Sequence, residues 1–168
     1  MLYAEVLSRL LNANVDYLII GGVAVNLQGY SRLTKDLDLM LKMKSENLLK
    51  AVEILLEAGF TTWLPVDPRG IADDATRRDW LENKNMLALS FKRGSLKLDI
   101  LFSAPIRFED MHRDNFRIGR FLYPVASKED LIRLKEVTGR PHDREDVDRL
   151  RILINLEKEG HSNGADKE

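Results

Sequence analysis

The sequence contains no cysteine, which excludes disulfide bonds and thiolate metal sites. It also lacks an apolar run close to the roughly 20 residues of a membrane-spanning helix, and its first residues lack the basic-then-apolar pattern of a secretory signal. Neither sign of charge is in excess, because the chain has 26 Lys and Arg residues and 27 Asp and Glu residues. No overall basic field therefore argues for nucleic acid. From the missing cysteines, membrane-spanning run and secretory signal, we expect a cytoplasmic protein that does not contact a membrane.

What the chain does have is an ordinary globular balance, with 44% hydrophobic and 32% charged residues among its 168 positions. This length fits one domain that buries a real core. We expect a single domain over residues 1–157, followed by a polar, disordered tail over residues 158–168.

The apolar pattern predicts alternating helices and strands in the first part of the chain. Apolar residues follow helical spacing over residues 2–12, and a run of β-formers at residues 15–20 predicts a buried strand that ends at Gly21-Gly22. A short helix is expected at residues 23–27. Strict alternation then predicts a strand at residues 36–41.

The rest of the chain predicts three helices, a β-hairpin, a further strand and one irregular segment. The expected ranges are a helix at 46–58 capped by Ser45 and ended by Gly59, an irregular segment at 64–80, strands at 86–91 and 96–102, a strand near 116–123, a helix at 128–137 ended by Gly139, and a last helix from Pro141 to about Leu156. This order indicates an α+β (or α/β) fold class, a mixed β-sheet with helices packed mainly on one face, plus C-terminal helices.

Three aspartates lie within predicted strands. Asp36 and Asp38 are two residues apart, so both side chains point to one face of their strand. Asp99 interrupts a second apolar strand in the same way. Aspartate is disfavoured in strands, and paired carboxylates repel unless a cation lies between them. A shared Mg²⁺ or Mn²⁺ site explains all three positions, whereas an isolated Asp-x-Asp is more often a solvent-facing strand edge.

The glycine pair Gly21-Gly22 lies between a predicted strand and a predicted helix. Glycines let backbone N–H groups approach a phosphate closely. A lone glycine pair is usually a tight turn. Here, however, the next strand carries Asp36 and Asp38, so the turn could place a triphosphate beside its metal ions.

The segment from Gly21 to Leu39 resembles the signature of the polymerase-beta-like nucleotidyltransferase superfamily. Within it, the segment is similar to the branch of the abortive-infection type E toxins and small uncharacterised nucleotidyltransferases. The resemblance extends over roughly residues 15–150. Beyond the glycine pair, the matching positions are Gly29, Arg32, Thr34, Asp36 and Asp38, a later acid at Asp99, and C-terminal Lys and Asp positions at Lys135 and Asp143.

The resemblance implies an enzyme that transfers a nucleoside monophosphate from an NTP to an acceptor and releases pyrophosphate, with Mg²⁺ or Mn²⁺ as cofactor. Asp99 would ligate the catalytic metal and help to activate the acceptor hydroxyl. The implied catalytic and metal-binding residues are Asp36, Asp38 and Asp99. The implied nucleotide-binding residues are Gly21, Gly22, Arg32, Thr34 and Lys135.

The acceptor implied for this branch is a hydroxyl group of RNA, tRNA or protein, with a toxin-like role and an antitoxin-type protein partner. Gly22 departs from the superfamily pattern, since many members have a phosphate-contacting serine there, and Gln28 stands where a histidine is frequent. Residues 61–85 match no known segment, and a separate substrate domain is not evident.

Two other functions fit parts of the sequence. A catalytically inactive module of the same fold would only bind nucleotide or a protein partner. A metal-dependent glycosyltransferase also uses an Asp-x-Asp motif, but the upstream glycine pair and Asp99 argue against it.

Overall fold

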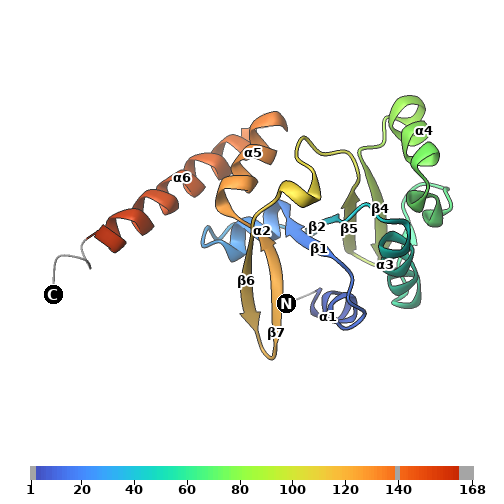
Figure 1. Ribbon diagram of the computed structural model, residues 1–168, viewed down its shortest axis with the longest axis horizontal. Coiled ribbons are helices and arrows are strands. Elements are labelled where there is room, and N and C mark those ends of the chain that lie inside the picture. The colour runs from blue at the N-terminus through green and yellow to red at the C-terminus, as the bar shows by residue number, and fades with distance from the viewer. Residues whose placement is uncertain (1–2, 139–140, 163–168) are drawn as a thin grey trace.

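The computed structural model describes residues 3–138 and 141–162 (Figure 1). In the first half of the chain the elements are α1 (Ala4–Asn12), β1 (Tyr17–Ile20), α2 (Gly21–Leu27), β2 (Asp36–Leu41), α3 (Ser45–Glu57), β3 (Thr61–Thr62), the 3₁₀ helix η1 (Pro68–Ala72) and α4 (Asp74–Lys84). In the second half they are β4 (Ala88–Arg93), β5 (Leu96–Leu101), the 3₁₀ helix η2 (Phe108–Asp110), β6 (Arg113–Ile118), β7 (Phe121–Ala126), α5 (Lys128–Thr138) and α6 (Pro141–Ser162).

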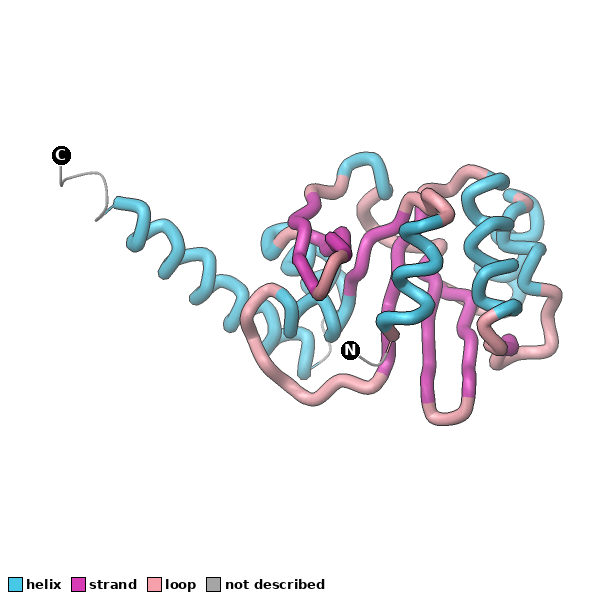
Figure 2. The backbone as a smooth tube through the Cα atoms, turned by 90° about the horizontal axis from the view of Figure 1, so that it is seen from below, coloured by secondary structure: helices cyan, strands magenta, loops and turns pink. Residues whose placement is uncertain are grey.

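Within the described residues the strands form one seven-stranded sheet in the order β3-β4-β5-β2-β1-β7-β6. Figure 2 draws the strands in magenta, with helices beside them in cyan. β2 pairs with β5, and β1 with β7, in parallel, and the other neighbours are antiparallel. The sheet is therefore mixed, as predicted. The interior strand β1 is buried along its whole length, as its continuous apolar run predicts.

The two faces of the sheet centre differ in chemistry. Leu37 and Leu39 are fully buried, whereas Asp36 and Asp38, which alternate with them along β2, are partly accessible.

Tyr3 contacts both acid-bearing strands near their N-terminal ends. Its hydroxyl lies 2.6 Å from the carbonyl oxygen of Lys35 and 2.8 Å from that of Lys97. This contact joins the starts of β2 and β5, so the two acid-bearing strands begin at one level.

The segment that we expected to be irregular at residues 64–80 is helical in its second part, so that prediction is wrong. Asp73 caps α4 by accepting a hydrogen bond of 2.7 Å from the backbone N–H of Thr76. Within α4 only Trp80 is buried, and its ring lies 5.9 Å from that of Phe102. A helix with one buried anchor has no apolar stripe, and the sequence pattern therefore missed it.

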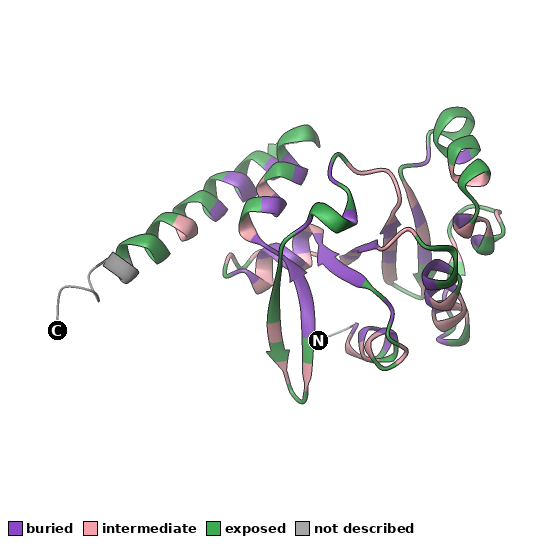
Figure 3. Ribbon diagram, viewed as in Figure 1, coloured by how far each residue is buried: buried purple, intermediate pink, exposed green. Residues whose placement is uncertain are grey.

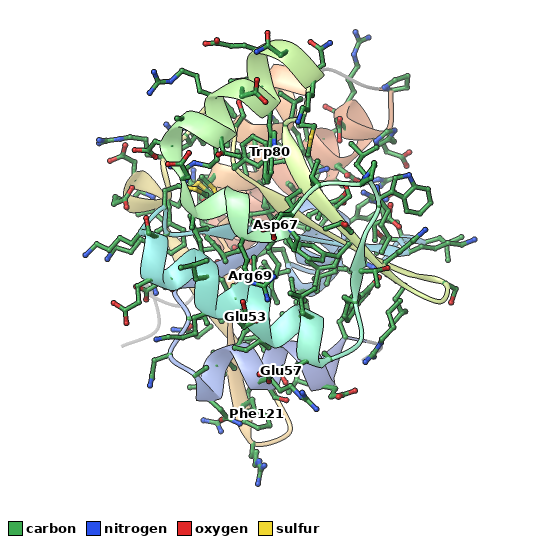
Figure 4. The ribbon with its side chains drawn as sticks, turned by 90° about the vertical axis from the view of Figure 1, so that its right-hand side faces the viewer. Glu53, Glu57, Asp67, Arg69, Trp80 and Phe121 are labelled. Atoms are coloured by element: carbon green, nitrogen blue, oxygen red, sulfur yellow. The ribbon has the colours of Figure 1, made fainter. Side chains whose placement is uncertain are left out.

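The same segment is joined to α3 by an ion pair. Arg69 of η1 donates two hydrogen bonds, of 2.8 and 3.2 Å, to the carboxylate of Glu53. Figure 4 shows Arg69 between Asp67 and Glu53, with Trp80 further along on α4. This segment is thus packed against α3.

The single strand expected near residues 116–123 is instead the end of β6 and the start of β7, joined by a tight turn. Ile118 pairs with Phe121, so Gly119 and Arg120 form a two-residue hairpin loop. Gly119 has φ +60°, which suits the first position of such loops. The strand expected at residues 86–91 lies two residues later, at Ala88–Arg93. The short strand β3 was not predicted at all.

The last helix continues to Ser162, beyond the expected end near Leu156. Its distal part is largely exposed (Figure 3). The expected helix stop at Gly139 and residues 163–168 of the expected tail lie outside the described residues. Across residues 3–138 and 141–162, no helix combines the length and apolarity that crossing a bilayer requires.

Candidate active site

The structure places the three predicted acids on one face of two neighbouring strands. In the parallel pairing of β2 with β5, Asp38 is opposite Asp99, and Asp36 is opposite Lys97. Residues opposite each other in a sheet share a face, so Asp36, Asp38 and Asp99 converge although 61 positions separate Asp38 from Asp99 in the numbering.

Lys97 provides a cation among these acids, which the sequence interpretation did not single out. Its Nζ lies 2.9 Å from Oδ2 of Asp99 and 3.8 Å from Oδ2 of Asp36. The hydrogen bond to Asp99 raises the pKa of Lys97 above its ordinary value. The ammonium group thus stays charged and offsets part of the carboxylate repulsion.

Asp38 remains electrostatically strained despite this cation. Burial of its carboxyl raises its pKa to about 6, and the negative charges of Asp99 and Asp36 add to the rise. The positive charges of Lys97 and Lys135 lower it only in part. Such a group favours either a proton or a further cation.

The donor set suits a divalent metal ion. Oδ1 of Asp99 is buried and has no hydrogen-bond partner, and carboxylate oxygens are the ligands that Mg²⁺ and Mn²⁺ prefer. In the part of the chain that the structure describes, no three Asp, Glu, His or Cys side chains are already close enough to enclose a metal. The carboxylates fit such an ion by chemistry, but the ion would have to draw them closer together and displace Lys97 from Asp99.

The glycine turn packs directly on the acidic strand. Gly21 has φ +66°, and a Cβ atom there would overlap the carboxylate of Asp38. A Cβ on Gly22 would lie 2.6 Å from Oγ1 of Thr34 and 2.8 Å from Nη2 of Arg32. Helix α2 begins at Gly21, two residues before the predicted start. Only glycine fits at the first position, for reasons of both space and backbone conformation.

The predicted nucleotide-binding cations lie beside the same turn. Arg32 is held in place by Asn26, whose side chain bonds the backbone N–H and C=O of Arg32 at 3.0 and 2.8 Å. Lys135 extends from α5 and is 9% exposed. Both cations contact Asp146 of α6, which is fully buried. Sequence reasoning missed Asp146, because an Asp in a charged helix start carries no distinguishing signal.

A cavity of about 750 Å³ opens at this face. Its lining includes all eight predicted site residues, which are Gly21, Gly22, Arg32, Thr34, Asp36, Asp38, Asp99 and Lys135. The volume is in the range of small-molecule sites. The remaining wall is mostly apolar and comes from β4, the segment after β5, and α5.

Replacing Gly21 with Ala is expected to destabilise the protein by about 2–4 kcal/mol, because the methyl group adds a clash to the strain of a positive φ. Gly94→Ala is the matched control. Gly94 has φ +58° and open space around its Cβ position, so this change should cost only about 1–2 kcal/mol. Urea unfolding of both variants measures the difference. Equal losses would contradict the close packing of Gly21 on Asp38.

No protein-family model matches the sequence, and no curated protein matches it. Solved structures match the fold. The lincosamide antibiotic adenylyltransferase LnuA, solved with lincomycin bound, is similar at a TM-score of 0.57 and 16% identity, over 89% of this chain and 94% of that one. ANT(2″)-Ia in complex with adenylyl-2″-tobramycin is similar at a TM-score of 0.55 and 13% identity, over 96% and 99% of the two chains.

The two similar chains span almost the whole of this one, so the likeness concerns the complete arrangement of sheet and helices. At these identities the likeness establishes the fold and leaves substrates open. The fold that the resemblance implies is confirmed, whereas the toxin branch stays a prediction. The chain has the nucleotidyltransferase fold.

Proposed function

We propose that this protein is a metal-dependent nucleotidyltransferase, which moves a nucleoside monophosphate from an NTP to an acceptor hydroxyl. The observation that carries the proposal is the convergence of Asp36, Asp38 and Asp99 beside the Gly21-Gly22 turn in one cavity. Carboxylates for cations and glycine backbone for phosphates are the two parts that nucleotidyl transfer needs.

The order of strands suggests a direction for the reaction. The glycine turn follows β1, Asp36 and Asp38 lie on β2, and Asp99 lies on β5. The pyrophosphate would therefore leave on the β1 side, and the acceptor hydroxyl would approach from the β5 and β4 side. Bound Mg²⁺ or Mn²⁺ would supply charge neutralisation at the phosphates and a more acidic hydroxyl.

Asp38 would hold the ion together with Asp36, and Asp99 would accept the hydroxyl proton or orient the hydroxyl for attack. Thr34 and Gly22 would border the phosphates, since the Thr34 hydroxyl lies against the backbone of Gly22. Lys135, which shares Asp146 with Arg32, would offset phosphate charge beside the turn.

The acceptor is the least constrained part of the proposal. The superfamily resemblance favours RNA, tRNA or a protein hydroxyl, together with a toxin-like role in the cytoplasm and an antitoxin-type partner. The wall beyond Asp99 is instead uncharged, being lined by Leu87, Ala88, Leu101, Ser103, Ala104 and Pro105. An RNA backbone is usually bound by unpaired cations, so this wall favours a compact acceptor with an apolar part.

Incubation with each α-³²P-labelled NTP and Mg²⁺ or Mn²⁺ tests the function. The acceptors are the RNA, protein and small-molecule fractions of one bacterial extract, and the Asp38→Asn variant serves as control. We expect label transfer by the parent only. Transfer into the small-molecule fraction would favour the apolar wall as acceptor site, and transfer into RNA or protein would favour the toxin-like role.

The inactive-module alternative makes a different prediction. It expects metal-dependent binding of an NTP by calorimetry, with label in none of the three fractions and no pyrophosphate release. Absence of both transfer and nucleotide binding would contradict the proposed function altogether.

A further inference from the structure

We infer that Asp146 is a positioning residue, which holds Arg32 and Lys135 together as a clamp for the terminal phosphates of the nucleotide. The inference rests on the proposed function, but it concerns residues on three elements that the acidic site does not explain. Arg32 and Lys135 would then recognise the polyphosphate chain of the nucleotide and not its base or sugar.

The contacts at Asp146 are dense. Its Oδ2 accepts hydrogen bonds from Nη2 of Arg32 at 3.0 Å and from Nζ of Lys135 at 2.7 Å, and its Oδ1 lies 2.8 Å from Nε of Arg32. Lys135 also contacts Oδ1 of Asp143 at 3.0 Å. One carboxylate therefore orients two cations that come from the loop before β2 and from α5.

The position of this cluster connects it with the phosphate end of the cavity. Nη2 of Arg32, the same atom that bonds Asp146, lies against Gly22. Lys135 lines the same cavity as Asp38 and the glycine pair. Arg32 and Lys135 line the cavity, whereas Asp146 lies behind them and does not. The two cations thus flank the glycine turn, with their shared anion on the far side.

A fully buried carboxylate is costly unless it is paired. Joining α6 to the domain does not require one, because Leu150 of the same helix already lies in the hydrophobic core. A carboxylate behind two cations does have a functional consequence. It fixes two long side chains whose free rotation would otherwise be lost on binding, so a phosphate chain meets a preorganised pair.

Calorimetry with Mg²⁺ tests the clamp through two probes, inorganic tripolyphosphate and AMP. For Asp146→Asn we expect tripolyphosphate to bind about tenfold more weakly and AMP to change less than about threefold. Arg32→Gln should act in the same way. Because both residues belong to one unit, the double variant should lose much less than the product of the single losses.

Asp130→Asn is the matched control. Asp130 is a buried carboxylate on α5 that bonds His112 and Arg133 outside the cavity. Its removal should leave the ratio of tripolyphosphate to AMP affinity unchanged. If Asp146→Asn does not fold, Arg32→Lys replaces it, because it keeps the charge but loses the two-point contact, and it should weaken tripolyphosphate binding about fivefold.

Equal weakening of tripolyphosphate and AMP by the Asp146 and Arg32 variants would overturn the inference and leave the proposed function intact. A loss of tripolyphosphate affinity in the double variant that equals the product of the two single losses would also overturn the inference and leave the proposed function intact. If the parent binds neither probe in the presence of Mg²⁺, the proposed function itself is contradicted, and the clamp with it.

Discussion

Asp38→Asn should abolish nucleotidyl transfer and at the same time make the folded chain more stable at neutral pH. We expect the transfer rate to fall by about 10³-fold or more, since the substitution would remove a proposed metal ligand and its charge from the proposed reacting centre. The opposite effect on stability follows from the environment of this carboxyl, which the fold holds in an unfavourable ionised state.

The direction of the stability change follows from the pKa of Asp38, which is about 6 in the folded protein against an ordinary value of 3.8. Below pH 3.8 the group is protonated in both the folded and the unfolded chain, and folding carries no penalty from it. As pH rises from about 4 to 6, the unfolded chain releases its proton first, so the free energy of unfolding decreases. Above pH 6 the full penalty is present.

Asparagine has the same shape and no charge, so Asp38→Asn should raise the free energy of unfolding at pH 7 by about 1–3 kcal/mol. At pH 4 the gain should largely disappear. Urea unfolding of metal-free protein at the two pH values measures both quantities. A variant that is no more stable than the parent at pH 7, or whose gain is the same at pH 4, would contradict this account.

Two other Asp→Asn variants separate this effect from general consequences of the substitution. The side chain of Asp36 is 49% exposed, so Asp36→Asn should stabilise the chain less, although it should still reduce transfer. Asp130 accepts hydrogen bonds from the His112 backbone and from Arg133, so Asp130→Asn should destabilise the chain. Of the three variants, Asp38→Asn should combine the largest gain in stability with a loss of activity.

The acidic site could be predicted from the sequence because its chemistry opposes local preference. Asp36, Asp38 and Asp99 interrupt apolar strands, and the alternation of a strand alone places the first two on one face. Their approach to Asp99 required the parallel pairing of β2 with β5. Neither residue spacing nor the superfamily resemblance predicted that pairing, since the resemblance implied only a third acid on a later strand.

The parts that the sequence did not reveal depend on tertiary contacts. Asp146 lies in a helix start where acids are common, and only its contacts with Arg32 and Lys135 distinguish it. Lys97 looks like an ordinary solvent-facing strand residue until the register places it opposite Asp36. Helix α4 was missed for a related reason, since its one buried residue, Trp80, gives no periodic pattern.

Lys97→Met should tighten the binding of Mn²⁺ by about tenfold or more. The ammonium group of Lys97 lies 2.9 Å from Asp99 and 3.8 Å from Asp36, so it neutralises the same carboxylates that a divalent ion would bind. A cation removed from within about 4 Å of the incoming ion removes several kcal/mol of repulsion even at an intermediate dielectric constant. Calorimetric titration of metal-free protein with Mn²⁺ measures the change in Kd.

The same substitution should reduce the stability of the metal-free chain, because the three acids lose their one neighbouring side-chain cation on β5, and added Mn²⁺ should restore it. Lys92→Met is the control. The Nζ of Lys92 lies 5.1 Å from the centre of the Trp63 ring, so its removal should leave the Mn²⁺ affinity unchanged. Weaker Mn²⁺ binding by Lys97→Met would mean that Lys97 holds the acids in their ion-binding arrangement. Tighter binding would mean that Lys97 stands in for the metal and must leave Asp99 before the ion can bind.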